Sequence, residues 1–128
     1  MAGERVLIVD DNATNLKLVA YLMKANGYVV ETALDAESAI EAIRLHHPEV
    51  ILMDIQLPGI DGLELTRRLK ADPKTRDIVI VAVTAYAMKG DQAKAQAAGC
   101  DDYITKPIDT RALPETIARH LAQREVVS

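Results

Sequence analysis

The chain has 128 residues, the usual size of one domain, and with 49% hydrophobic and 27% charged residues it has the composition of a folded globular protein rather than a disordered one. The net charge of −4 and the absence of Trp and Phe argue against a nucleic-acid-binding protein, which needs a basic face and usually stacking side chains. No segment approaches the roughly 18 apolar residues of a membrane span, and no secretory signal opens the chain, so we expect a cytoplasmic protein with no membrane insertion.

Five short runs predict β-strands, at 6–9, 28–32, 50–53, 78–83 and 102–104. The first, third and fourth are apolar throughout, which is typical of parallel strands that are covered on both faces. The run 28–32 is more polar, and we therefore expect it at an edge of the sheet.

Helical patterns alternate with these strands. Apolar residues at helical spacing mark one face of each helix: Leu16, Val19, Ala20 and Met23, then Ala36, Ile40 and Ile43, then Leu65 and Leu69, and last Leu113, Ile117 and Leu121. Asn26-Gly27 should end the first helix in a left-handed turn, and Asp35 and Asp109 could cap two others.

The stretch 87–98 also reads as a helix that stops at Gly99, but its apolar side is mostly alanine and it contains Gly90. We expect this helix to be the most weakly held. Strand and helix thus alternate five times, which predicts one α/β domain over residues 1–128, a doubly wound five-stranded parallel sheet with five helices. Rossmann order is possible, but five strands in one small unit favour the flavodoxin-like order 2-1-3-4-5.

Polar residues gather where four of the predicted strands end: Asp10-Asp11, Asp54, Thr84 and Lys106. In an open α/β sheet, ligands bind at the carboxyl ends of the strands, where these residues lie. Three neighbouring carboxylates repel one another, so either one holds a proton or a cation neutralises them, and oxygen-only ligands suit Mg²⁺, or else Mn²⁺, better than zinc. Each residue alone could be a helix cap, a strand end or a surface charge, but their joint placement favours phosphoryl transfer with Asp54 as nucleophile.

At these positions the chain resembles the receiver domains of two-component response regulators, over essentially its whole length. The matching stretches are Val9-Asp10-Asp11-Asn12, Met53 to Gly62, Val83-Thr84-Ala85 and Asp102 to Pro107. The run 81–91 looks most like a single-domain regulator of cell polarity within this family and like the receivers of hybrid kinases. The segment 123–128 is too short for a DNA-binding output domain, so we expect a receiver without an output domain that acts through protein contacts.

The resemblance implies a role for each residue of the cluster. Asp54 would accept the phosphoryl group, and Thr84 and Lys106 would contact it. The Mg²⁺ ligands would be Asp10, Asp11, Asp54 and the backbone carbonyl of Gln56. Such a protein is a signalling switch that assists its own phosphorylation and dephosphorylation, and is not an enzyme acting on other substrates.

The resemblance also implies a switch and partners. Tyr103 matches the family's switch aromatic and would respond together with Thr84. The Lys106-Pro107 bond would be cis, and Gln56 and Tyr86 occupy positions that tune the rate of hydrolysis. The donor would be a histidine kinase or a phosphotransfer protein. A downstream protein would bind the surface of the fourth helix, fifth strand and fifth helix of a monomer or a phosphorylation-dependent dimer.

Two other classes of protein share part of this pattern. An aspartate-nucleophile phosphatase uses the same chemistry, but it typically places a second Asp two residues after the nucleophile, where this chain has Gln56. A flavin-binding electron carrier shares the strand order, but its phosphate loop is rich in Gly, Ser and Thr, where this chain has Asp10-Asp11-Asn12.

The remaining chemically notable residues have simpler explanations. The single cysteine, Cys100, cannot form an internal disulfide and is expected to be a small packing residue. His46 and His47 lie at a helix end, where a cation complements the helix dipole, rather than at the exposed mid-helix position of a phosphotransfer histidine. His120 is expected in solvent, and 70–77 as a charged, solvated loop.

Overall fold

Five parallel strands form a sheet in the order β2-β1-β3-β4-β5 in the computed structural model, which describes residues 3–55, 57, 61–84, 90–106 and 108–127. The strands are β1 Arg5–Val9, β2 Val29–Ala33, β3 Val50–Asp54, β4 Val79–Thr84 and β5 Asp102–Thr105. The predicted flavodoxin-like, doubly wound order is confirmed, and so is the edge position of β2.

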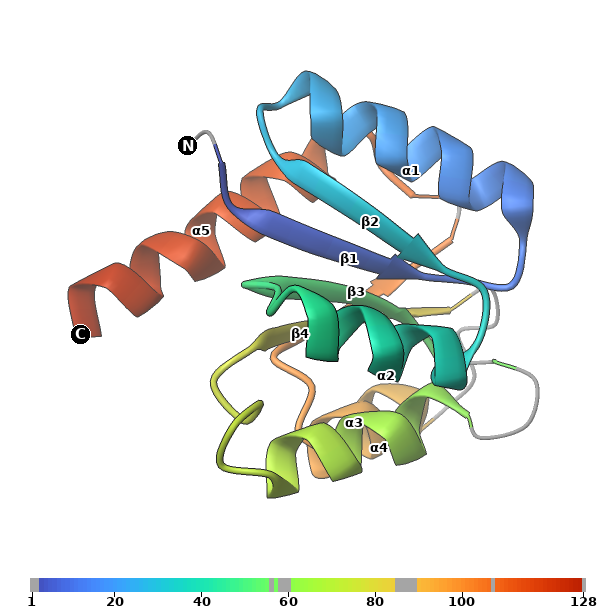
Figure 1. The fold of residues 1–128 in the computed structure, drawn as a ribbon, viewed down its shortest axis with the longest axis vertical. Coiled ribbons are helices and arrows are strands. Elements are labelled where there is room, and N and C mark those ends of the chain that lie inside the picture. Colours follow the sequence, from blue (N-terminus) through green and yellow to red (C-terminus); the bar gives the residue numbers. More distant parts are fainter. Residues whose placement is uncertain (1–2, 56, 58–60, 85–89, 107, 128) are drawn as a thin grey trace.

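Helices cover both faces of this sheet, with α1 and α5 on one face and α2, α3 and α4 on the other (Figure 1). They span α1 Ala13–Ala25, α2 Ala36–Leu45, α3 Gly62–Ala71, α4 Asp91–Ala98 and α5 Ala112–Val127. Because successive residues of a strand point to opposite faces, Val6 and Ile8 pack towards α1 and α5, and Leu7 and Val9 pack towards α2 and α3. None of the described helices combines the length and the apolar content that a membrane crossing needs.

The predicted caps and stops are in place. The Asp35 carboxylate accepts the backbone N–H of Ser38 over 2.8 Å at the start of α2, and Asp109 accepts the N–H of Ala112 over 3.1 Å at the start of α5. Gly27 has a φ of 90°, the left-handed conformation that ends α1.

Two helix predictions need correction. Ile40 was expected on the buried face of α2, but it is 37% exposed and Ala39 is buried in its place. Gly90 was expected inside a helix over 87–98, but it has a φ of 92° and is the residue before the first turn of α4. Residues 87–89 lie outside the described residues, and only Ala95 and Ala98 of the described helix are buried.

The charged run 70–77 is not simply a solvated loop, as the sequence suggested. Lys70 lies in α3, and its ammonium donates to the carbonyl oxygen of Ile78 over 2.7 Å and to the carboxylate of Asp101 over 3.0 Å. Thr75 is buried and donates to the carbonyl oxygen of Leu69 over 2.6 Å. This segment therefore fastens α3 to the start of β4 and to the loop before β5.

His120 is likewise not in solvent. Its side chain is 15% exposed, and Nε2 lies 2.9 Å from Oδ2 of Asp102, which also accepts from Arg119 over 3.3 Å. These contacts join α5 to the start of β5. Cys100, in contrast, is a packing residue as predicted, half-buried against the cores on the α3 and α4 side.

Candidate functional site

The fold brings the predicted site residues to one edge of the sheet. Asp10 follows β1 directly, Asp54 is the last residue of β3, Thr84 is the last residue of β4, and Lys106 follows β5. Because β1 and β3 are neighbours while β2 continues the sheet on the other side, this edge is the point where the strand order reverses. Asp10, Asp54 and Thr84 are buried, with 6%, 4% and 0% of their surfaces exposed, whereas Asp11 is exposed.

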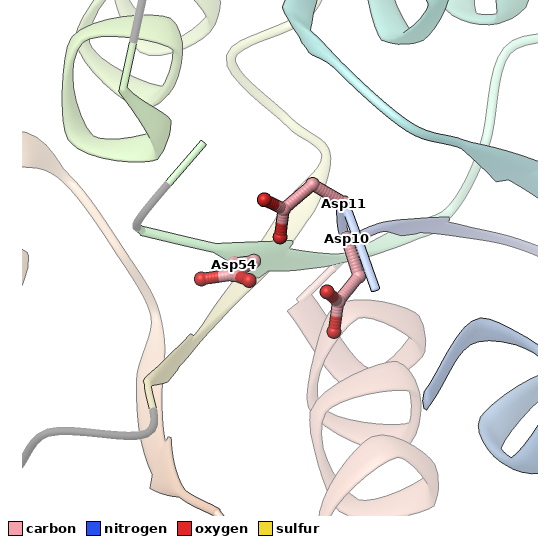
Figure 2. A group of neighbouring side chains, drawn as sticks. All are labelled: Asp10, Asp11 and Asp54. Atoms are coloured by element: carbon pink, nitrogen blue, oxygen red, sulfur yellow. The ribbon is translucent and has the colours of Figure 1, made fainter. Parts of the chain in front are cut away.

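Three carboxylates meet at the ends of β1 and β3. One oxygen from each of Asp10, Asp11 and Asp54 lies within 4.8 Å of the other two, and Figure 2 shows the three side chains around the same space. The Asp10 carboxylate also accepts the backbone N–H of Asn12 over 2.9 Å, which fixes one of its oxygens. The predicted clustering of these residues is therefore present in the fold.

Lys106 reaches into this cluster from β5. Its Nζ lies 2.9 Å from Oδ2 of Asp10 and 3.4 Å from Oδ2 of Asp54. Burial lowers the pKa of this amine, but the hydrogen bond to Asp10 and the charges of Asp54 and Asp10 outweigh burial, and the pKa of Lys106 is raised above its usual value. Lys106 thus carries a positive charge at neutral pH.

The charge and the donor atoms of this group fit a hard divalent cation. Three carboxylates and one ammonium give the group a net charge of −2 (1 − 3 = −2). The carboxylates present only oxygen atoms, one of them from an exposed residue that water can reach, and such a set matches Mg²⁺ or Mn²⁺ rather than zinc.

The backbone joins the last two predicted site residues. The N–H of Lys106 donates to the carbonyl oxygen of Thr84 over 2.7 Å, so the ends of β4 and β5 are held together next to the carboxylates. Gln56, Tyr86 and Pro107, which were predicted as a metal ligand, a tuning residue and half of a cis bond, lie outside the described residues.

Tyr103 lies on β5, two residues before its end, and is half-buried. It packs against a small cluster that consists of Ile55, Ala82 and Ala95, beside β4 and α4. Of the predicted switch pair, Tyr103 thus contacts the cluster that includes Ala95 of α4, and Thr84 is the buried last residue of β4, the strand next to β5.

Comparison with known proteins decides the family. The response regulator receiver domain matches residues 6–118 of the chain. This chain belongs to the response regulator receiver family. The match includes the three carboxylates, Thr84 and Lys106.

The relatives and solved structures agree with this assignment. The polar-differentiation response regulator DivK of Brucella ovis is 47% identical over 116 residues, which cover 91% of this chain and 94% of that protein. A CheY-like receiver domain protein from Methanospirillum hungatei superposes with a TM-score of 0.92 at 31% identity, covering 99% of this chain and 100% of the other. The receiver domain of the sensor histidine kinase PA1611 from Pseudomonas aeruginosa, described with magnesium coordinated in its active-site cleft, gives a TM-score of 0.83 at 33% identity, covering 92% of this chain and 97% of the other.

The sequence analysis gave one residue near the site, Gly62, no role beyond its place in the matching stretch Met53 to Gly62. Gly62, the first residue of α3, donates its backbone N–H to the carbonyl oxygen of Ile55, the residue after Asp54, over 3.3 Å. In the sequence, Gly62 stands directly after Asp61 at the end of that stretch, and this pattern by itself does not predict a contact with β3.

Proposed function

We propose that this receiver domain accepts a phosphoryl group on Asp54 from a histidine kinase or a phosphotransfer protein and signals by phosphorylation-controlled protein contacts. One observation carries the proposal: the buried Asp54 carboxylate ends β3 within 4.8 Å of carboxylate oxygens of Asp10 and Asp11, and 3.4 Å from the Lys106 ammonium. An anionic nucleophile beside a fixed cation and a cation-binding oxygen set is what phosphoryl transfer requires.

In the proposed step, a carboxylate oxygen of Asp54 attacks the phosphorus atom of a phosphohistidine. The bond between phosphorus and the donor nitrogen breaks, that nitrogen takes the electron pair, and an acyl phosphate forms on Asp54. Lys106, whose ammonium lies 3.4 Å from Asp54, would contact the incoming phosphoryl oxygens, and burial of Asp54 would limit the access of competing water to the nucleophile. The Thr84 hydroxyl, at the end of the neighbouring strand, would hold the phosphoryl group from the β4 side.

The carboxylates of Asp10, Asp11 and Asp54, with the backbone carbonyl of Gln56, are the proposed ligands of Mg²⁺ or Mn²⁺. When bound, the cation supplies positive charge that offsets the carboxylates and the phosphoryl oxygens. Without it, a group with a net charge of −2 would repel a phosphorylated donor.

The weak packing of α4 supports a conformational change that a protein partner recognises. Only Ala95 and Ala98 of α4 are buried, and Gly90 provides no side-chain cap. We propose that phosphorylation acts through Thr84 and Tyr103 on the surface of α4, β5 and α5, where the downstream protein binds.

The experiment that tests the phosphoacceptor compares Asp54→Asn with Asp72→Asn, a matched change at the C-terminal end of α3. Purified protein is incubated with radiolabelled acetyl phosphate and MgCl₂. We expect labelling of the wild type and of Asp72→Asn, and none of Asp54→Asn or of wild type in excess EDTA. Undiminished labelling of Asp54→Asn would show that the acceptor lies elsewhere.

A further inference from the structure

Gly62 is a glycine for a reason other than its backbone conformation. It is the first residue of α3, and it is not among the glycines with positive φ, which are Gly3, Gly27, Gly90 and Gly99. A helical position with negative φ admits any L-residue, and glycine is among the poorest helix formers. Another feature must therefore account for the missing side chain.

That feature is the distance to the proposed phosphoacceptor. A Cβ atom on Gly62 would lie 2.3 Å from the carbonyl oxygen of Asp54, 2.7 Å from Cα of Ile55 and 3.0 Å from the carbonyl carbon of Asp54. All three are backbone atoms, and they cannot rotate away as the end of a side chain can. Either α3 or the backbone after Asp54 would have to move.

Gly99 gives a contrasting case. A Cβ atom there would lie 2.8 Å from Cγ of Lys70, a flexible side chain, at a φ of 107°. At Gly3 and Gly90 no heavy atom lies within 4 Å of such a Cβ atom. Among these four glycines, Gly62 alone abuts the main chain of another element.

The contact between α3 and β3 is held from several sides. The N–H of Gly62 donates to the carbonyl oxygen of Ile55 over 3.3 Å, and the N–H of Ile55 donates to Val83 on β4 over 3.1 Å. The buried hydroxyl of Thr66 donates to the carbonyl oxygen of Gly62 over 2.8 Å, and Asp61 caps the helix by accepting the N–H of Glu64 over 2.8 Å. The first turn of α3 is thereby fixed against the peptide group that follows Asp54.

We infer that Gly62 is a positioning residue for phosphoryl acceptance: its bare Cα lets α3 pack on the Asp54-Ile55 peptide and so fixes the direction of the Asp54 carboxylate. This inference rests on the proposed role of Asp54. The peptide group after Asp54 sets the backbone from which its side chain projects, and the carboxylate must keep its place near Lys106 and the oxygens of Asp10 and Asp11. Small misplacements of a reacting group of about 1 Å can reduce a rate by about a hundredfold.

The test compares Gly62→Ala with Gly99→Ala, which introduces the same methyl group at a glycine with positive φ, where the Cβ atom would meet the Lys70 side chain instead of the backbone of Asp54. For each variant, the rate of phosphoryl uptake is measured against acetyl phosphate concentration, and the free energy of unfolding is measured in urea. We expect Gly62→Ala to lower the maximal rate at least tenfold with a half-saturating donor concentration within about twofold of wild type. Gly99→Ala should keep the wild-type maximal rate within twofold.

A second measurement, made without Mg²⁺ or phosphoryl donor, detects a change in the position of the Asp54 backbone independently of the rate of phosphoryl uptake. In the metal-free protein, the amide resonances of Asp54 and Ile55 should move in Gly62→Ala and stay in place in Gly99→Ala. If Gly62→Ala is too unstable to fold, Thr66→Val removes the bond to the Gly62 carbonyl without changing the side chain's shape, and it should lower the maximal rate at least threefold.

The outcomes are distinct. A folded Gly62→Ala with the wild-type maximal rate overturns the inference, as does a loss in Gly99→Ala equal to that in Gly62→Ala. If only Thr66→Val can be measured, a wild-type rate overturns it. Failure of the proposed function looks different, because the wild-type protein would then take up no label on Asp54.

Discussion

Lys106 and Asp10, which are 96 positions apart in the chain, form an ion pair in which Nζ lies 2.9 Å from Oδ2. Their side chains are 15% and 8% exposed, so the pair is largely shielded from water. The same ammonium lies 3.4 Å from Asp54. One cation thus lies between two buried carboxylates, and its removal should cost stability as well as phosphoryl transfer.

Lys106→Met should lower the free energy of unfolding at neutral pH, without added MgCl₂, by about 3 kcal/mol, because it leaves buried carboxylates without their ammonium partner. Urea unfolding followed by circular dichroism measures the change. Lys17→Met, at an exposed position of α1, is the matched control and should change stability by less than about 0.5 kcal/mol. An equal loss in both variants would contradict the importance of the ion pair.

The contribution of Lys106 should also depend on pH. The pKa of Lys106 is raised in the folded protein, so the ammonium stabilises the fold fully below its ordinary pKa of 10.5, and this contribution is lost as pH rises through the higher folded value. The difference in unfolding free energy between wild type and Lys106→Met should therefore be constant around neutral pH and shrink above about pH 10.5. A difference that shrinks already between pH 6 and 8 would point to another group.

Asp11→Ala should weaken Mg²⁺ binding at least tenfold, because it removes the exposed member of the carboxylate group and leaves a hard cation with too few oxygen ligands. The fold should survive, and the metal-free protein should become more stable by roughly 1 kcal/mol, since one of three neighbouring negative charges is gone. Titration calorimetry with MgCl₂ measures the affinity, and Glu37→Ala on α2 serves as the control. Unchanged affinity would leave Asp11 as a loop residue with no part in cation binding.

Much of the fold could be predicted from the sequence because its strongest signals are local. Apolar runs such as 50–53 and 78–83 match buried parallel strands, and Asp35 and Gly27 match helix ends. The clustering of Asp10, Asp11 and Asp54 followed from topology, since parallel strands end at the same edge.

Two of the contacts that sequence analysis missed join distant parts of the chain. His120 meets Asp102 because α5 returns along the start of β5, and Lys70 meets Asp101 because α3 ends beside the loop before β5. In the linear sequence each of these residues has polar neighbours that suggest solvent. Ile40 differs for another reason: Ala36, Ala39 and Ile43 form the buried face of α2, and Ile40 lies at the margin of that face.

Asp102→Asn should lower the free energy of unfolding at pH 7 by roughly 1 kcal/mol. The effect is small because the carboxylate is partly exposed, and water screens its ion pairs with Arg119 and His120. Burial raises the pKa of Asp102, but the hydrogen bonds from His120 and from the backbone N–H of Tyr103, with the charges of His120 and Arg119, lower it overall. A depressed pKa means that the ionised carboxylate stabilises the fold above its ordinary pKa of 3.8 and that this is lost as pH falls through the lower folded value.

Urea unfolding of wild type and Asp102→Asn at pH 7 and at pH 3 measures this effect. The difference in unfolding free energy should be largest at pH 7 and smaller at pH 3, which lies below the ordinary pKa of 3.8, so that Asp102 of the unfolded chain is mostly protonated. Asp72→Asn, whose carboxylate accepts the backbone N–H of Lys74 over 2.9 Å at the end of α3, should show a smaller change at pH 7. A difference that is equal at both pH values would show that the amide fails for steric reasons and not through loss of charge.

Thr84→Ala should still be phosphorylated on Asp54 but should not pass the signal to α4. Thr84 is fully buried at the end of β4, and Tyr103 packs beside Ala95 of α4. Alanine contacts bury little area, so two packings of α4 can differ in free energy by only a few kcal/mol. One new charge-assisted contact is enough to shift the equilibrium between them. If the Thr84 hydroxyl moves towards the phosphoryl group, Tyr103 gains space to turn inward, and the surface of α4, β5 and α5 changes.

Amide hydrogen exchange with and without beryllofluoride, a phosphoryl mimic, measures this coupling. In the wild type and in Thr84→Ser, which keeps the hydroxyl, protection should change at least threefold in 91–98 and around Tyr103. In Thr84→Ala the change in these regions should be lost while Asp54 still takes up label from acetyl phosphate. The helix is anchored at its C-terminal end, where Ala98 is buried and Lys70 holds Asp101, so the largest change should fall near Asp91. Unchanged protection of 91–98 in the wild type, with changes elsewhere, would show that the signal leaves the site by another route.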